Sequence, residues 1–164
     1  YKKIIYIKRK NLLSNARTLM KDVILDFLNF IEKNSDLKNV NLVLLQPTSP
    51  QRKTIDIDRA IKYFKKRDKY PLISFSEPIS DPNNTFHIKK KKLFPFNKSF
   101  QSKNRQNFKK SLYINGSIYI VNAANYIRSP NLLTPTSTVF EMHKKHSIQI
   151  DDYFDLYLMK KIII

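Results

Sequence analysis

Four consecutive apolar residues, Leu42 to Leu45, stop abruptly at the polar, proline-bearing stretch Gln46 to Pro50. An apolar run of this length between turn residues is typical of a strand buried on both faces, as parallel strands are inside an α/β sheet. The two prolines of the stretch prevent the strand from continuing, because proline has no backbone N–H to give to a sheet. The sequence therefore predicts a buried strand that ends in a polar corner.

This corner is a candidate binding site. Ligands of open α/β sheets bind at the carboxyl ends of the strands, where the corner should lie. Gln46, Thr48 and Ser49 would present an amide and two hydroxyls there. We therefore predict that these three residues contact the substrate.

Helical and strand patterns alternate on both sides of the corner. A three-four spacing of apolar residues predicts helices over 18–33 and 54–67, the second with Thr54 as its N-cap. Shorter patterns predict strands over 3–8, 71–77, 113–121, 137–142 and 147–151, a strand or ribbon over 86–100, and helices over 122–127 and 152–164. The pattern predicts a single three-layer α/β domain, residues 1–164, with a mostly parallel sheet and a right-handed crossover between its parallel strands.

The only glycine of the chain, Gly116, interrupts the predicted strand over 113–121. Glycine weakens a strand, so a single one in a composition so poor in it suggests a position that tolerates no side chain. A bulge or a close approach to a ligand would have this requirement. The neighbouring Asn115 is then a candidate ligand contact.

The formal charge of +18, from 31 Lys and Arg against 13 Asp and Glu, is high enough to attract polyanions. A nucleic-acid partner would explain it. We favour a compositional explanation instead, because the chain is also rich in Asn, Ile, Phe and Tyr and poor in Gly, a joint skew toward residues with A/T-rich codons. No glycine-bearing RNA-binding motif surrounds the aromatic residues, so we expect no nucleic-acid partner. A basic surface would also attract a nucleoside triphosphate.

Other bulk properties exclude several classes of protein. With no cysteine there is no disulfide framework and no thiolate nucleophile or metal site. No apolar window is long enough to span a bilayer, and the first residues do not resemble a signal peptide, so we expect a cytoplasmic protein with no membrane partner. The three histidines have no ligand spacing and are expected at the surface. The first residue, Tyr1, suggests a fragment of a longer protein.

The corner also carries a family resemblance. The sequence LLQPTSPQR is similar to the LLQPTSPLR motif of the acylneuraminate cytidylyltransferases, the CMP-sialic acid synthetases and their relatives. Three further pieces follow in the family's order: Arg105-Gln106, Asn115 to Ile120, and Ser147 to Asp151. The resemblance extends from about Arg9 to the C-terminus.

The resemblance implies a nucleotide-diphospho-sugar transferase-like, Rossmann-like fold and the transfer of a cytidylyl group. CTP and a sialic-type nonulosonic acid would be the substrates, Mg²⁺ the cofactor, and a homodimer the assembly. Gln46 and Asn115 would hydrogen-bond the sugar acid, and Arg105 with Gln106 would lie over its polar groups. Arg9 would contact the nucleotide. These side chains should converge on one edge of the sheet.

Asp151 would be the catalytic metal ligand, since paired carboxylates can hold a cation that bridges phosphate oxygens. Relatives usually have aspartate at the position of Gln149 as well, so metal binding through Asp151 alone should be weak. Asp151 or Asp152 would otherwise simply cap the last helix. Arg9 and Arg105 likewise have a plain alternative as solvated basic residues.

The family's first strand and its Gly-, Ser- and Lys/Arg-bearing phosphate loop have no counterpart in this sequence. Because that loop supplies backbone donors to the triphosphate, we expect this chain alone to bind CTP poorly and to turn over little. Two alternatives stay open: a non-catalytic remnant or sugar-acid-binding module, and a basic nucleic-acid-binding protein.

Overall fold

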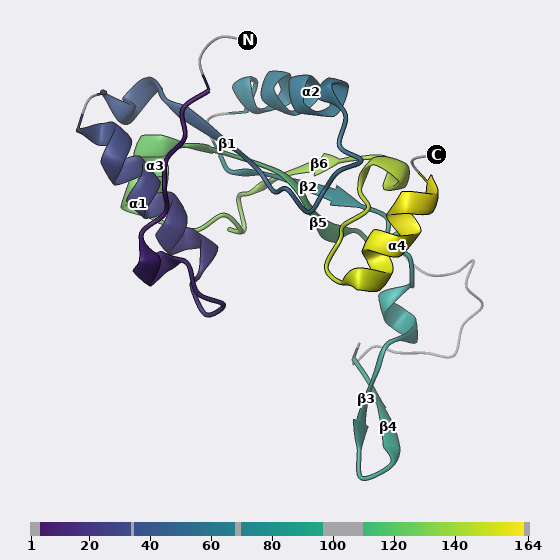
Figure 1. Ribbon diagram of the computed structural model, residues 1–164. Coiled ribbons are helices and arrows are strands. Elements are labelled where there is room, and N and C mark those ends of the chain that lie inside the picture. Colours follow the sequence, from purple (N-terminus) through teal and green to yellow (C-terminus); the bar gives the residue numbers. More distant parts are fainter. Residues whose placement is uncertain (1–3, 34, 68–69, 97–109, 163–164) are drawn as a thin grey trace.

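The computed structural model describes residues 4–33, 35–67, 70–96 and 110–162. Their main sheet has four strands in the order β1-β5-β2-β6 (Figure 1). The strands are β1 (Asn41–Leu45), β2 (Leu72–Ser76), β5 (Tyr113–Asn122) and β6 (Thr138–Glu141). The α/β class is as predicted.

The prediction of a mostly parallel sheet is wrong, because the sheet is mixed. Strand β5 lies between β1 and β2 and is antiparallel to both, whereas β2 and β6 pair in parallel. Strands β1, β2 and β6 therefore run in one direction without all being neighbours. Their carboxyl ends still meet at one edge of the sheet, where the polar corner after β1 lies.

The prediction that β1 is buried on both faces is confirmed only in part. In the described sheet β1 is an edge strand that pairs only with β5. Its central residues are half-buried, and Leu45 is 36% exposed. The centre of the sheet is β5, in which Ile118 and Ile120 are almost completely buried.

The predicted helices form. They are α1 (Met20–Glu32), α2 (Thr54–Lys65), α3 (Ala123–Arg128) and α4 (Tyr153–Ile162). Within the described ranges, 3-10 turns at Asn11–Leu13, Leu37–Asn39, Pro82–Asn84 and Lys144–His146 connect other elements. Lys53, not Thr54, is the N-cap of α2, and the Asp56 carboxylate accepts the Lys53 N–H at 3.1 Å. No helix in the described ranges is both long and apolar enough to cross a bilayer.

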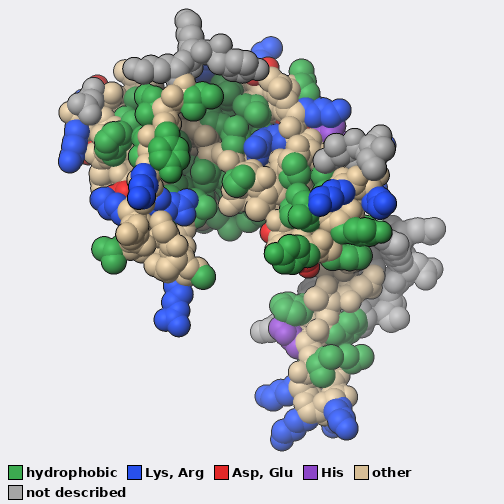
Figure 2. Space-filling view, in the orientation of Figure 1, with side chains coloured by type: hydrophobic (Ala, Val, Ile, Leu, Met, Phe, Trp, Pro, Cys, Tyr) green, Lys and Arg blue, Asp and Glu red, His purple; other side chains and the backbone are tan. Residues whose placement is uncertain are grey.

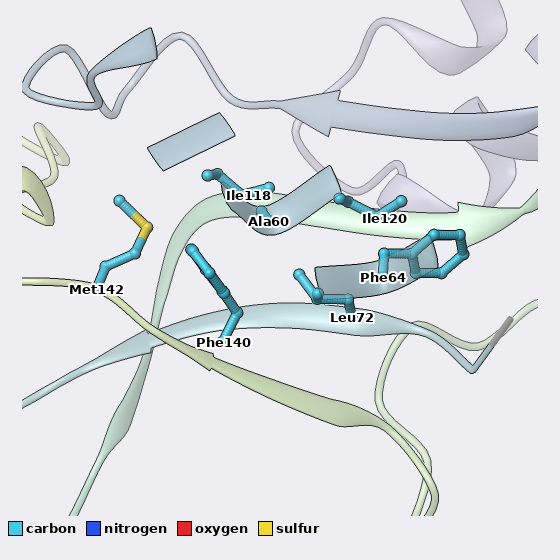
Figure 3. Close-up of a cluster of buried hydrophobic side chains, with 7 residues drawn as sticks. All are labelled: Ala60, Phe64, Leu72, Ile118, Ile120, Phe140 and Met142. Carbon is cyan, nitrogen blue, oxygen red and sulfur yellow. The ribbon is translucent and has the colours of Figure 1, made fainter. Parts of the chain in front are cut away.

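Two hydrophobic clusters hold the helices on the sheet. The first joins α2 to β2, β5 and β6 through Ala60, Phe64, Leu72, Ile118, Ile120, Phe140 and Met142 (Figure 3). The second joins α1 and α3 to β5 through Ile24, Leu28, Leu37, Val121, Ala123 and Tyr126. Val43 of β1 packs on the first cluster, whereas Leu42 and Leu44 pack on the second. Alternate residues of a strand point to opposite faces, so the two clusters cover the two faces of β1.

A separate hairpin projects from this body (Figure 1). It consists of β3 (Phe86–Lys89) and β4 (Lys92–Pro95), which confirms a ribbon over the described part of 86–100. Lys90 and Lys91 form its turn with φ of 49° and 61°, the positive values that a two-residue hairpin turn of type I′ requires. Lysine side chains gather at the tip of the hairpin (Figure 2).

Two predicted strands do not form. Residues 4–8 pair with no strand of the described chain, and Ile4 and Tyr6 are 89% and 86% exposed. The segment 147–151 also lies outside the sheet. An alternating pattern makes a strand only where its backbone groups pair with those of a neighbouring strand, and neither segment is placed alongside a strand in the described chain.

Candidate functional site

The corner after β1 is a compact turn fastened to β5. The Ser49 N–H donates to the Gln46 carbonyl at 3.3 Å. The Arg52 guanidinium, through Nη1, donates to the same carbonyl at 3.2 Å and to the Ser117 carbonyl at 2.7 Å. Burial lowers the pKa of Arg52. One arginine thus connects the end of β1 to the middle of β5.

Gly116 lies where three distant parts of the chain meet. Its φ is +65°, and the pairing of β2 with β5 shifts register beside it, between Ile73 and Phe75. A Cβ at Gly116 would lie 1.9 Å from Gln149 Nε2 and 2.7 Å from Gln46 Oε1. A side chain here would be strained by the positive φ and would displace the ends of the Gln149 and Gln46 side chains, in agreement with the prediction of a position that disfavours one.

Asn115 is fully buried and holds this irregular part of β5 in place. Its Oδ1 accepts the Ser74 hydroxyl at 2.5 Å and the Ser117 N–H at 3.1 Å, and its Nδ2 donates to Ser147 Oγ at 2.9 Å. These bonds occupy the amide oxygen and one N–H. Contact between Asn115 and a ligand stays a prediction.

The segment 143–151 supplies the third side of the site. Its Ile150 N–H donates to the Thr48 carbonyl at 2.9 Å, which fastens the segment to the corner. Gln149 is half-buried beside Gly116, and Asp151 is exposed. Ser49 is 1% exposed, and its hydroxyl has no hydrogen-bond partner among the described residues. The structure therefore brings together Gln46, Thr48, Asn115 and the 149–151 segment.

The carboxylates at this edge fit a divalent cation poorly. Asp152 Oδ1 accepts the Asp155 N–H at 2.9 Å, and Asp155 Oδ2 accepts the N–H groups of Asp151 and Asp152 at 2.9 and 3.2 Å. Asp152 and Asp155 thereby cap α4, which confirms the helix-cap alternative for Asp152. Of these three acids, only Asp151 has a carboxylate that takes no part in the capping bonds, and Asp151 is exposed to solvent. Within the described ranges, no group of three or more His, Cys, Asp or Glu side chains is placed to bind a metal.

Arg9 and Gln46 line the same cavity, an apolar trough of about 690 Å³ between β1, α1 and the segment 7–10. The structure therefore places the predicted nucleotide contact and one predicted sugar contact within one cavity. Arg105 and Gln106 lie outside the described residues. Their predicted roles stay predictions.

Sequence reasoning missed two features of this site. Arg52 lies within the corner motif, but the motif by itself predicts no role for it. His146 was expected at the surface, but only 23% of its side chain is exposed and its Nδ1 lies 2.9 Å from Asp56 Oδ2. No local pattern indicates that contact, because the two residues are far apart in the sequence.

No family model matches the chain. Several curated relatives do. The N-acylneuraminate cytidylyltransferase of Streptococcus agalactiae serotype III (strain NEM316) is 31% identical over 149 residues, which are 88% of this chain and 34% of that protein. The enzyme of the same name from Escherichia coli O18:K1:H7 (strain RS218 / NMEC) is 28% identical over 119 residues, 72% of this chain and 28% of that protein.

The chain thus spans about a third of the length of the curated relatives it matches. The match includes most of the chain, and the relatives it finds are those that the corner motif indicated. The resemblance inferred from the sequence is confirmed. Over most of its length, this chain is similar to the curated N-acylneuraminate cytidylyltransferases.

Proposed function

We propose that this chain forms the sugar-acid side of a cytidylyltransferase site, which activates a sialic-type nonulosonic acid with CTP. One observation carries the proposal: Gln46, Gly116 and Gln149 meet at the carboxyl edge of the sheet, next to the trough that Arg9 lines. Amide side chains around a bare stretch of backbone offer both donors and acceptors to a polyhydroxylated ligand.

In the proposed reaction the anomeric hydroxyl oxygen of the sugar acid attacks the α-phosphorus of CTP. A new O–P bond forms, the bond to the β-phosphate bridging oxygen breaks, pyrophosphate leaves, and the hydroxyl proton is lost to solvent. Such a transfer depends on alignment of the reactants and on fixed donors rather than on a covalent intermediate. The protein's part is therefore to hold the hydroxyl in line with the leaving pyrophosphate.

The proposed roles divide between the two substrates. Gln46, with Thr48 and Ser49 beside it, holds the sugar acid, and the second N–H of Asn115 adds one donor. Arg105 and Gln106 bind its carboxylate and hydroxyls, because a guanidinium matches a carboxylate with two parallel hydrogen bonds. Arg9 contacts the nucleotide. Since the carboxylates fit Mg²⁺ poorly, no step is assigned to a metal on this chain.

We further propose that residues 1–164 are one domain and form a partial nucleotide-diphospho-sugar transferase fold in three layers. The phosphate loop of that fold is not among these residues, whose single glycine is Gly116 at the site. We therefore expect the isolated chain to bind the sugar acid more readily than CTP and to release little pyrophosphate.

Two measurements on the isolated chain test this function. Calorimetric titration with N-acetylneuraminic acid in the absence of CTP should give binding that Gln46→Ala weakens. The matched control is Asn131→Ala, which removes an exposed amide from the loop after α3. A coupled pyrophosphate assay should give little turnover. Absence of sugar-acid binding in the folded chain would reject the proposal. Turnover near that of complete relatives would reject the expectation that the isolated chain releases little pyrophosphate.

A non-catalytic sugar-acid-binding module is the second candidate. It is favoured by Gln149, at a position where the family resemblance implies aspartate, and by the use of Asp152 and Asp155 as helix caps. Addition of CTP and Mg²⁺ separates the two candidates. If the chain is an enzyme, the addition should raise its affinity for the sugar acid or lead to product. If it is a binding module, its affinity for the sugar acid should stay the same and no product should form.

A further inference from the structure

The pair His146 and Asp56 connects two elements that border the site. His146 Nδ1 lies 2.9 Å from Asp56 Oδ2, and the two side chains are 23% and 5% exposed. Asp56 belongs to the first turn of α2, and His146 is the last residue of the 3-10 turn Lys144–His146. Among the contacts of an acidic side chain with Lys, Arg or His in the described residues, this is the one in which neither side chain is mostly exposed to solvent. Both of its side chains come from segments beside the corner.

The Asp56 carboxylate has two tasks. Its Oδ2 faces His146 and also accepts the Lys53 N–H at 3.1 Å, where the corner ends and α2 begins. The ring of His143 lies beside the pair, 5.9 Å from that of His146 between centroids. Water can easily replace a contact between exposed side chains, but it reaches a mostly buried contact only when the surrounding structure opens. The contact of His146 with Asp56 should therefore restrain the 3-10 turn more than a surface contact would.

The contact of His146 with Asp56 affects the position of Gln149. The segment that carries it is attached to the corner after Gln149, by the Ile150 N–H on the Thr48 carbonyl. Before Gln149 it has two attachments: Ser147 Oγ accepts the Asn115 amide, and His146 contacts Asp56. Between the attachments on the two sides the Gln149 amide lies against Gly116 and Gln46. Loss of the His146 contact would leave the segment less firmly held before Gln149, so that the Gln149 amide could move away from Gly116 more often.

We infer that His146 and Asp56 are a positioning pair, which holds Gln149 and Asp151 at the substrate edge without touching substrate. As far as the ligand is concerned, this inference rests on the proposed function. A pair that only adds stability would lower the free energy of unfolding equally for the whole domain. A positioning pair loosens the 147–151 segment selectively.

Amide hydrogen exchange of the full chain tests the inference without any ligand. In His146→Ala, exchange of the Ile150 N–H should be about tenfold faster, as expected when a local opening no longer has to break one buried polar contact. Exchange of the Ile120 N–H in the centre of β5 should change far less. The matched control is Lys145→Ala, which removes an exposed cation from the same turn and should leave both amides unchanged.

The neutral double variant Asp56→Asn/His146→Gln covers the case in which His146→Ala does not fold, because it leaves no unpaired buried charge. Its Ile150 N–H should still exchange faster than in the parent protein. Equal exchange in a folded variant, or equal acceleration of Ile150 and Ile120, would overturn the inference. Titration with N-acetylneuraminic acid is the second measurement, and His146→Ala should weaken binding whereas Lys145→Ala should not. If the parent protein does not bind the sugar acid, the proposed function fails while the exchange data still decide the positioning role.

Discussion

The side-chain amide of Gln149 lies against the backbone of Gly116, so closely that a Cβ added there would lie 1.9 Å from Gln149 Nε2. The bare backbone of Gly116 therefore makes room for Gln149, and Gln46 closes the other side. This contact joins the corner after β1, the centre of β5 and the segment before α4. It makes one site from three pieces of sequence.

Substitution of Gly116 tests how much this contact depends on glycine. Gly116→Ala should lower the free energy of unfolding by about 1 to 2 kcal/mol, because a left-handed φ is costly for any residue with a Cβ. The clash with Gln149 adds to this cost. The same substitution made in Gln149→Ala should cost less, and urea denaturation of the four proteins measures the difference. An equal loss of stability from Gly116→Ala in the parent protein and in Gln149→Ala would mean that the Gln149 side chain moves aside without cost.

Restoration of a second carboxylate tests the metal interpretation. Gln149→Asp places an acid near Asp151, and paired carboxylates bind Mg²⁺ or Mn²⁺ better than one carboxylate and an amide do. We expect measurable Mn²⁺ binding by electron paramagnetic resonance in Gln149→Asp and much weaker binding in the parent protein. Gln149→Asn is the neutral control, and Asp151→Asn should abolish the gain. Equally strong binding in the parent protein would contradict the poor fit described above.

Arg52 should be important for the stability of the corner. Arg52→Ala removes the donor to the Gln46 and Ser117 carbonyls. A hydrogen bond that involves a charged group contributes about 1.5 to 3 kcal/mol to the free energy of unfolding. We expect a loss of the order of 2 kcal/mol by urea denaturation. Arg52→Lys should recover little of it, because an ammonium group cannot reproduce the guanidinium fork. Arg67→Ala, which loses an exposed contact with Tyr63, is the control and should change stability much less.

The buried Tyr126 predicts a loss of stability at alkaline pH. Burial, and to a smaller extent the charge of Asp22, raises the pKa of Tyr126 in the folded protein. Its neutral form is therefore preferred on folding, and this contribution is complete below the ordinary tyrosine pKa of about 10. It is lost as the pH rises through the higher, folded-state pKa, because the unfolded chain ionises first. The free energy of unfolding should thus fall above about pH 10.

Tyr126→Phe provides the measurement. The Tyr126 hydroxyl is buried without a hydrogen-bond partner among the described residues, so its removal should be neutral or stabilising at pH 7. The alkaline fall in stability should also be shallower, although Tyr119, whose pKa burial also raises, will contribute part of it. Tyr153→Phe, at a position 91% exposed, is the control. An unchanged alkaline profile in Tyr126→Phe would contradict the prediction.

The apolar trough beside β1 predicts self-association. An edge strand with an apolar neighbouring surface is a site for pairing with another chain. Leu45, which lines the trough and is 36% exposed, is a suitable position for a test. Leu45→Lys should reduce association in analytical ultracentrifugation, whereas Leu133→Lys, in the exposed loop before β6, should not. A monomer at all concentrations would count against the expected homodimer.

Local patterns predicted the elements that depend on local contacts. The apolar spacing located α1 and α2 to within a few residues, because each helix satisfies its own backbone and needs only one apolar face toward the sheet. The lone glycine marked the irregular part of β5 correctly, since glycine adopts a positive φ without the steric cost that other residues meet. The corner motif identified the family before any geometry was known.

Tertiary contacts decided the rest. The position of β5 between β1 and β2 made the sheet mixed and β1 an edge strand, because pairing depends on which backbone edges meet and not on the pattern within one strand. The same reason left residues 4–8 and 147–151 without strand partners. The sequence alone therefore determined helices, turn chemistry and family, which are encoded residue by residue. Other features arise only when the packed sheet brings together segments far apart in the chain. These are the burial of Asn115, the hydrogen bonds of Arg52 to two carbonyls, and the contact of His146 with Asp56.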